Sequence, residues 1–390
     1  MDLPERYVRL CLRVEPHIDG FVDAYVGPPE WREAVAAEQP VDPAALRAEA
    51  VALLEELDGA GLEDDRVRWL RGQLVALECA TARLAGSEMG WADEVERSFG
   101  VRPRRTDTSA FAAAHARLDA VLPGQGALRD RYVVWEERNA VPRDVLVPAL
   151  ERLKDALGPR AHALAPMPTD ESVTYELVSA TPWLAYNWYL GAFRSRVDVN
   201  ADIPMSILLL VSLAAHEAYP GHHTERVAKD ALLTRERGRV ETSITILSAP
   251  EALVSEGIAT NALEQALGSE PYTAVAEVLG GLFTFDPAEA HEITRAEAAL
   301  EDVGTNAAFM LHEDGAAEGD VEAYMRDWAL ASDARAALAV RFFQDSASRI
   351  YVSTYTDGRR LCEAYAARAP GNFARLLTEQ LTTADILDAV

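Results

Sequence analysis

The chain contains 390 residues, of which 49% are hydrophobic, and this fraction is sufficient for a large buried core. Its 63 acidic residues outnumber its 37 lysines and arginines, so the formal net charge is −26. Such a surface repels phosphate backbones and anionic membranes, and we therefore expect no nucleic acid and no membrane among the partners of the protein. The charge favours cationic substrates, but an acidic proteome background explains it equally well.

The N-terminal segment is amphipathic from its first residues and lacks the apolar core of a signal peptide. The longest apolar stretch, residues 203–215, is interrupted by two serines and is shorter than the roughly 18 residues that indicate a membrane span. Cys11, Cys79 and Cys362 are too few and too scattered for a disulfide framework or a thiolate metal site. These features predict a cytoplasmic protein.

Residues 1–165 show the pattern of consecutive amphipathic helices. The first is predicted over residues 6–25, and a second begins at Asp42-Pro43, with proline in the tolerated first turn. A further helix begins at Pro142 and carries an apolar stripe suited to core packing, formed by Val145, Leu146, Ala149, Leu150, Leu153 and Leu157. The sequence therefore predicts an N-terminal helical region over residues 1–165.

The pattern changes at the start of a second region, residues 166–390. Residues 173–179 alternate and are rich in strand formers, residues 183–189 are aromatic, and residues 192–199 alternate strictly. We expect these segments to form one small sheet. From Pro204 onward the pattern is helical to the C-terminus, so this region is predicted to be mainly helical, with its sheet placed directly before a cluster of histidines.

Three of the eight histidines lie in one segment of eight positions, His216-Glu217-Ala218-Tyr219-Pro220-Gly221-His222-His223. In the motif His-Glu-x-x-His, a helix places two histidines one turn apart for zinc, and the glutamate acts as general base. Here proline occupies the position of the second histidine and cannot donate a backbone hydrogen bond. The following glycine permits backbone angles that are closed to other residues. We therefore expect the helix to bulge or end at residues 219–221.

This break decides which second histidine can share a metal with His216. In a regular helix, His222 would lie about 240° round from His216 and would point away from the metal, so only a local break brings it back. His223 lies on the correct face of a continued helix, but roughly 10 Å along its axis. We prefer His222 as the ligand and His223 as a residue that supports the ligands, and we keep His223 as the alternative ligand.

A catalytic zinc needs a third protein ligand and an open coordination position. The candidates lie in a predicted helix that opens at Ser248-Ala249-Pro250. Glu256 is preferred because Gly257 beside it lets another helix approach closely, whereas Glu251 in the first turn complements the helix dipole. The sequence thus predicts one Zn²⁺ per chain, with Glu217 accepting a proton from water as general base and with a ligand set of His216, His222 and Glu256.

These residues resemble the bacterial family known as domain of unknown function 885, whose members carry His-Glu-x-x-Pro-Gly-His-His. Further segments resemble that family in the same order, and they are Val141-Pro142-Arg143-Asp144, Tyr186-Asn187-Trp188-Tyr189, Val197-Asp198-Val199-Asn200, Glu256-Gly257-Ile258-Ala259 and Tyr355-Thr356-Asp357-Gly358. The resemblance covers roughly residues 140–360, although Ile258 stands where the family usually has tryptophan. It implies a helical metallopeptidase of the zincin type.

We expect a mainly α-helical, bilobal, zincin-like fold of the gluzincin type, in which residues 166–390 form the catalytic region or both regions form one compact unit. One small β-sheet would line the active-site cleft, with residues 192–199 as the edge to which an extended peptide adds. A hydroxyl is needed to stabilise the oxyanion, and Tyr355 is the first candidate and Tyr351 the second.

Arg349 and Arg341 are the candidates for binding a substrate carboxylate, because guanidinium pairs bidentately with it. For both arginines and both tyrosines, an ordinary structural role is an equal alternative. The predicted function is hydrolysis of amide bonds in a short peptide. One alternative is a metal-dependent hydrolase or tailoring enzyme that acts on a non-peptide small molecule, such as an amide. The other is a non-enzymatic helical binding protein with a relic site, against which the retained Glu217 argues.

Overall fold

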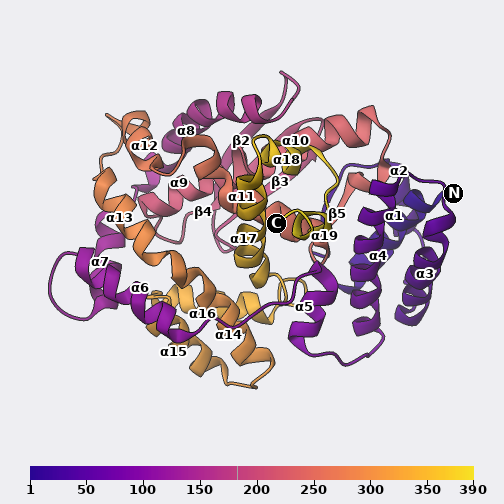
Figure 1. The fold of residues 1–390 in the computed structure, drawn as a ribbon, viewed down its shortest axis with the longest axis horizontal. Coiled ribbons are helices and arrows are strands. Elements are labelled where there is room, and N and C mark those ends of the chain that lie inside the picture. Colours follow the sequence, from indigo (N-terminus) through magenta and orange to yellow (C-terminus); the bar gives the residue numbers. More distant parts are fainter. Residues whose placement is uncertain (182) are drawn as a thin grey trace.

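The computed structural model describes residues 1–181 and 183–390 and shows a mainly α-helical protein with two small sheets (Figure 1). Helices up to residue 164 are α1 (Leu3–Val14), α2 (Pro29–Ala36), α3 (Pro43–Glu56), α4 (Asp64–Leu84), α5 (Trp91–Phe99), α6 (Thr108–Val121), α7 (Leu128–Arg138) and α8 (Arg143–Leu164). Helices from residue 207 onward are α9 (Ile207–Leu213), α10 (His222–Lys229), α11 (Pro250–Leu267), α12 (Pro271–Leu279), α13 (Pro287–Glu297), α14 (Val303–His312), α15 (Glu318–Trp328), α16 (Asp333–Gln344), α17 (Val352–Arg368), α18 (Asn372–Thr378) and α19 (Thr383–Leu387). Within the described ranges, no helix has the length and hydropathy of a membrane span.

Two of the predicted helix starts are confirmed. Asp42 precedes α3, and its carboxylate accepts a hydrogen bond from the backbone N–H of Ala44, which satisfies one of the free donors of the first turn. Pro142 precedes α8, which buries the predicted stripe except for the half-buried Val145. The pattern of apolar residues therefore identifies the inner face of α8.

The prediction of one helix over residues 6–25 is wrong. Helix α1 ends at Val14, a 3-10 turn covers Glu15–His17, and the chain then forms strand β1 (Val22–Tyr25). Pro16 cannot donate a helical hydrogen bond, and Gly20 has a φ of 75°, which takes the backbone out of the helical region. Strand β1 pairs antiparallel with β5 (Ile244–Ile246), so the protein has a second sheet that the sequence pattern does not reveal.

The other sheet contains β2 (Ser172–Val178), β3 (Ala185–Gly191) and β4 (Arg194–Asn200), in the order β2-β4-β3. Its three strands were expected, but the placement of residues 192–199 at the edge is wrong, because β4 pairs with β2 in parallel and with β3 antiparallel. Strictly alternating residues fit a central strand as well as an edge strand when one face is buried. The edges of this sheet are β2 and β3.

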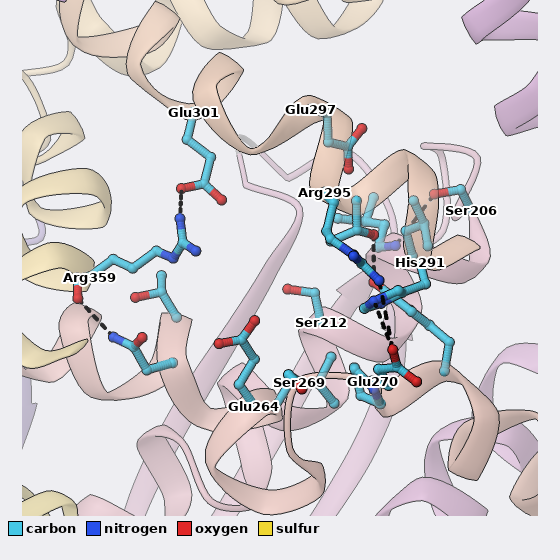
Figure 2. A pocket seen from close by; sticks show the side chains of 18 of the residues that line it. Ser206, Ser212, Glu264, Ser269, Glu270, His291, Arg295, Glu297, Glu301 and Arg359 are labelled. Carbon is cyan, nitrogen blue, oxygen red and sulfur yellow. Dashed lines mark hydrogen bonds and ion pairs between the residues drawn. The ribbon is translucent and has the colours of Figure 1, made fainter. Parts of the chain in front are cut away.

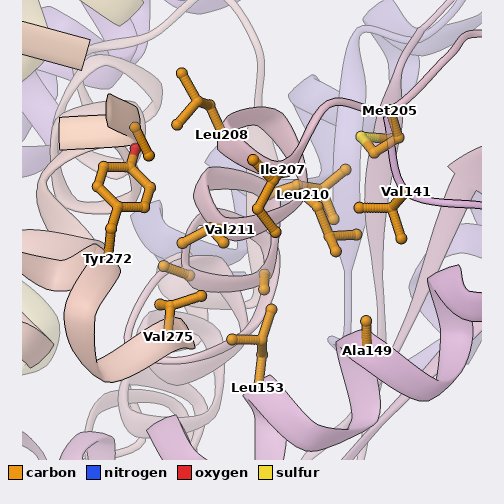
Figure 3. Packing of buried hydrophobic residues seen from close by; sticks show 14 of the residues in the cluster. Val141, Ala149, Leu153, Met205, Ile207, Leu208, Leu210, Val211, Tyr272 and Val275 are labelled. Carbon is orange, nitrogen blue, oxygen red and sulfur yellow. The ribbon is translucent and has the colours of Figure 1, made fainter. Parts of the chain in front are cut away.

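The apolar segment before the histidine motif is anchored in the largest hydrophobic cluster. Figure 3 shows side chains of α9 between those of α8 and α12, and the labelled residues include Leu153, Ile207, Leu210, Val211 and Val275. Each of these five side chains is buried. Helix α9 is therefore held on several sides by core packing, which fixes the position from which the chain enters the motif.

Helices α11 and α17 cross in close contact at a pair of glycines, and Figure 1 shows the two helices next to one another at the centre of the fold. A β-carbon added to Gly257 would lie 2.3 Å from the carbonyl oxygen of Gly358, and one added to Gly358 would lie 2.4 Å from the carbonyl oxygen of Leu253. The close helix approach expected from Gly257 is thus confirmed. It brings the start of α17 next to Glu256.

We expect Gly257→Ala to destabilise the fold by about 1–3 kcal/mol, because the added methyl group forces two packed backbones apart. The measurement is chemical unfolding followed by circular dichroism. Gly319→Ala is the matched control, because Gly319 lies in α15 with no atom within 4 Å of an added β-carbon. That control should be neutral or stabilising by up to ~1 kcal/mol. Equal stabilities for both variants would contradict the packing argument.

Candidate metal centre

The helix is interrupted within the histidine motif, as the proline predicts. Helix α9 continues into a π-helical turn (Ala214–Ala218), Tyr219 is extended, and α10 begins at His222. The Tyr219–Pro220 peptide bond is cis, and the N–H of Gly221 donates to the carbonyl oxygen of Ala215 at 3.0 Å. This rearrangement brings the rings of His216 and His222 together, with their centroids 4.7 Å apart.

Gly221 is required for space. Its φ is −79° and its ψ is −136°, so the φ lies outside the left-handed region that favours glycine. An added β-carbon would instead lie 1.9 Å from the carbonyl oxygen of His216 and 2.5 Å from that of Ala215. A glycine at this position lets the start of α10 pack directly against the π-helical turn.

His216, His222 and Glu256 converge from the π-helical turn, α10 and α11. Glu256 Oε2 lies 3.4 Å from His216 Nε2, and Glu256 Oε1 lies 3.3 Å from His222 Nε2. The candidate ligand atoms of the three side chains all lie within 4.8 Å of one another. These spacings suit one shared ion, because ligand atoms in a tetrahedral site with bonds of about 2.1 Å lie about 3.4 Å apart.

The carboxylate of Glu256 supplies an independent test of this fit. Its side chain is buried, and among the described residues no group forms a hydrogen bond to Oε2. A buried carboxylate oxygen without a partner is costly, and a cation held between the three side chains would remove that cost. Two imidazole nitrogens and one carboxylate are also a common catalytic donor set for zinc. The residues present therefore fit a zinc ion.

A chain of buried polar groups orients His222. Its Nδ1 lies 3.1 Å from Ser255 Oγ, and the hydroxyl of Ser255 donates to Glu225 Oε2 at 2.5 Å. Lys229 donates to the other oxygen of Glu225 at 2.6 Å. Because the hydroxyl of Ser255 donates its hydrogen bond to Glu225, the serine oxygen can accept a hydrogen bond from the Nδ1–H of His222. This assignment leaves a lone pair on Nε2 of His222 for a metal ion. We call the three candidate ligands, His216, His222 and Glu256, the metal group.

The neighbouring His223 points elsewhere. It is fully buried, its Nδ1 lies 2.8 Å from Ser195 Oγ, and its Nε2 lies 2.7 Å from Glu171 Oε2. Although burial opposes ionisation, hydrogen bonds from His223 and Tyr219 lower the pKa of Glu171 to about 2. His223 therefore ties the start of α10 to the sheet through Ser195 of β4.

Glu217 lies beside the metal group, and its backbone carbonyl oxygen accepts a hydrogen bond of 2.5 Å from Asn187 of β3. Burial raises the pKa of the Glu217 carboxyl, while the nearby histidines His216 and His222 oppose this rise. A carboxylate with a raised pKa is better suited to accept a proton and release it again near neutral pH.

The two candidate tyrosines occupy different places. The Tyr351 hydroxyl donates to Glu256 Oε1 at 2.7 Å, so its proton is engaged by a candidate ligand. Tyr355 packs edge-on against Tyr351, with ring centroids 5.7 Å apart, and is 37% exposed. Desolvation of the side chain and the charges of Glu256 and Glu217 raise the pKa of Tyr355, which keeps the hydroxyl protonated. Of the two tyrosines, Tyr355 is therefore the one whose hydroxyl proton is not engaged by a candidate ligand.

The two candidate arginines are not brought to the metal group. The guanidinium of Arg349 pairs with Glu94 of α5 at 2.6 Å, and its carbonyl oxygen accepts from the indole of Trp91 at 2.8 Å. Arg341 lies in α16 and is exposed. A carboxylate-binding role at the metal group has no support in these contacts.

Sequence reasoning missed Asp23 and Arg226. Arg226 Nη2 lies 2.8 Å from Asp23 Oδ2, and the hydroxyl of Tyr186 also donates to Asp23. The charge of Asp23 acts on Glu217 and on both tyrosines of the site. Asp23 belongs to β1, which pairs with β5 far along the chain, and its contacts with Tyr186 and Arg226 hold it at the site. No motif near residue 23 signals this role.

No family model matches the chain, and no curated protein matches it. A candidate lipoprotein from Colwellia psychrerythraea is similar in structure, with a TM-score of 0.52 and 16% identity over 88% of this chain and 65% of that chain. A candidate lipoprotein of unknown function from Shewanella oneidensis gives a TM-score of 0.50 and 14% identity over 92% of this chain and 75% of that chain. An M32 carboxypeptidase from Deinococcus radiodurans R1 gives a TM-score of 0.37 and 12% identity over 96% of this chain and 86% of that chain.

The first two similarities show a shared helical fold, and the third is too weak to carry an argument. The chain spans 65% of the length of the Colwellia protein, so that protein contains further structure without a counterpart here. Membership of the family named from the histidine motif stays a prediction.

We expect purified protein to contain about one zinc per chain and to lose most of it in His222→Ala, since a catalytic zinc relies on three protein ligands. His223→Ala should keep zinc bound and weaken its affinity by about tenfold to a hundredfold, as the loss of a supporting contact does. Plasma emission spectrometry of dialysed protein measures the metal. Loss of zinc in His223→Ala with retention in His222→Ala would reverse the ligand assignment.

Ser255→Ala should weaken zinc affinity by about tenfold to a hundredfold, because His222 loses the acceptor that holds its Nδ1–H. Competition with a chromogenic chelator gives the dissociation constant. Thr378→Ala in α18 is the control, since its hydroxyl donates to the backbone carbonyl of Ala374 in its own helix. An affinity of Ser255→Ala equal to that of this control would remove the proposed orienting contact.

Proposed function

We propose that this protein is a zinc-dependent hydrolase that cleaves amide bonds of short peptides. The observation that carries the proposal is the donor set formed by the half-buried His216 and His222 and the buried Glu256, with its spacings of 3.3 and 3.4 Å. The partnerless Oε2 of Glu256 supports a cation at this place. The adjoining carboxylate of Glu217 favours an enzyme over a protein that only stores metal or is stabilised by it.

In the proposed hydrolysis, different residues of the chain activate water, stabilise the oxyanion and hold the metal ligands. Zinc, when bound, supplies a Lewis acid that polarises the scissile carbonyl and acidifies water. Glu217 accepts a proton from the attacking water and delivers it to the leaving amine. The protonated hydroxyl of Tyr355 donates to the oxyanion that develops on the carbonyl oxygen. Tyr351 and the Ser255–Glu225 pair hold the ligands in place.

The edge strand that we assign to an extended substrate is β3, in place of the central strand β4. β3 has a single strand neighbour among the described residues, which leaves its other side without a ladder partner. Its side chains Trp188 and Leu190 are 38% and 63% exposed, and Asn187 connects it to Glu217. A peptide that adds along β3 would therefore pass beside the general base.

Glu217→Gln should retain zinc and fold yet lose at least about a hundredfold in kcat, the usual contribution of a general base. The assay measures release of free amines from a mixture of short peptides. Glu277→Gln, on the exposed face of α12, is the control and should hydrolyse the mixture at the normal rate. Near-normal turnover by Glu217→Gln would sink the mechanism, and cleavage confined to non-peptide amides would replace the peptide substrate by a small molecule.

A further inference from the structure

A cleft of about 500 Å³ lies between α9, α11, α12, α13 and α17 (Figure 2). Its volume is in the range of pockets that hold small ligands or single side chains of larger ones. Figure 2 shows Ser212, Glu264, Glu297, Glu301 and Arg359 around one open space, with Glu264 projecting into it from α11. The cleft contains none of the metal-group residues and is therefore a separate feature of the surface.

The cleft nevertheless adjoins the metal group. Two of its lining residues lie four positions from a residue near the metal centre on the same α-helix, and these pairs are Thr260 with Glu256 on α11 and Arg359 with Tyr355 on α17. Residues four apart lie about one turn from one another on one face of a helix. Both pairs therefore place the nearer end of the cleft about one helical turn from the proposed reaction centre.

The charges in the cleft are unbalanced. Five glutamates and three arginines line it, and each arginine is paired with a glutamate: Arg335 with Glu136 at 2.8 Å, Arg359 with Glu301 at 2.8 Å, and Arg295 with Glu270 at 3.7 Å. Two carboxylates are left over. Among the described residues, neither Glu264 nor Glu297 has a cationic side chain within 4.0 Å. The described part of the cleft therefore offers two carboxyl groups without a cationic partner.

Glu297 is the more constrained of the two. One of its carboxylate oxygens accepts a hydrogen bond from the hydroxyl of Tyr132 at 2.6 Å. Burial and the charge of Glu136 raise the pKa of Glu297 to about 7, although the hydrogen bond from Tyr132 lowers it. A half-buried carboxyl in this state gains most from an arriving cation, which would stabilise its ionised form.

We propose that this cleft binds a lysine or arginine side chain of the substrate, with Glu264 and Glu297 as its partners. The inference rests on the proposed function and assigns a substrate class to the same active site. Glu264 lies two helical turns after Glu256 on α11, so one helix carries both a zinc ligand and a specificity residue. The net charge of −26 also draws cationic peptides toward the protein.

The test compares tripeptides that contain lysine with isosteric tripeptides that contain norleucine, at each position in turn. At one position, kcat/KM should favour lysine by at least about tenfold, the range of a charge-assisted hydrogen bond. Glu264→Gln and Glu297→Gln should each lower this ratio, and the double variant should lower it by at least about tenfold. Glu292→Gln is the matched control, because Glu292 is an exposed glutamate of α13 outside the cleft.

A binding measurement separates this inference from the proposed function. Calorimetry of zinc-loaded Glu217→Gln with the same tripeptides should show tighter binding of the lysine peptide, and the difference should vanish when both cleft glutamates are replaced. Selective binding without hydrolysis by the unsubstituted protein would overturn the proposed function and support the cation site. Hydrolysis with equal kcat/KM for lysine and norleucine at every position, or equal binding of both peptides, would overturn the cation site and leave the hydrolase intact.

Discussion

The buried carboxylate of Glu256 is the constraint around which the centre of the protein is arranged. An ionised group that has lost its water must be surrounded by compensating charge or hydrogen bonds. Here both histidines of the metal group and the hydroxyl of Tyr351 converge on it from three different elements. Each contact requires a local departure from regular structure, namely the π-helical turn, the abrupt start of α10 and the glycine crossing of α11 with α17.

The sequence predicted structure correctly where a residue changes the local backbone directly, as proline, glycine and helix-capping residues do. Pro220 cannot take part in a helical ladder, and the break it imposes is present and places His222 beside His216. Gly257 predicts a close neighbour, which proves to be α17. Helix starts at Asp42 and Pro142 were predictable for the same reason, because capping and first-turn preferences are local. The ligand roles themselves stay a prediction that metal analysis decides.

Sequence reasoning failed where position depends on partners far away in the chain. The alternation of residues 192–199 identifies a strand with one buried face but cannot tell how many neighbours it has, and β4 proves to be central. Arg349 has the chemistry of a carboxylate binder, yet the nearby Glu94 engages it. The fold is also shared with proteins of 14% and 16% identity, so its determinants are distributed over many weakly specified positions.

The pairing of β1 with β5 has a consequence for the order in which the protein matures. Val22 is synthesised early and its partner Ile246 much later, so β1 leaves the ribosome long before its complement exists. Throughout that interval its backbone donors and acceptors are open to other chains, a state that chaperones exist to shield. Asp23, which pairs with Arg226, belongs to this strand. The candidate metal centre is therefore completed late in biogenesis, and a stalled nascent chain carries no finished site.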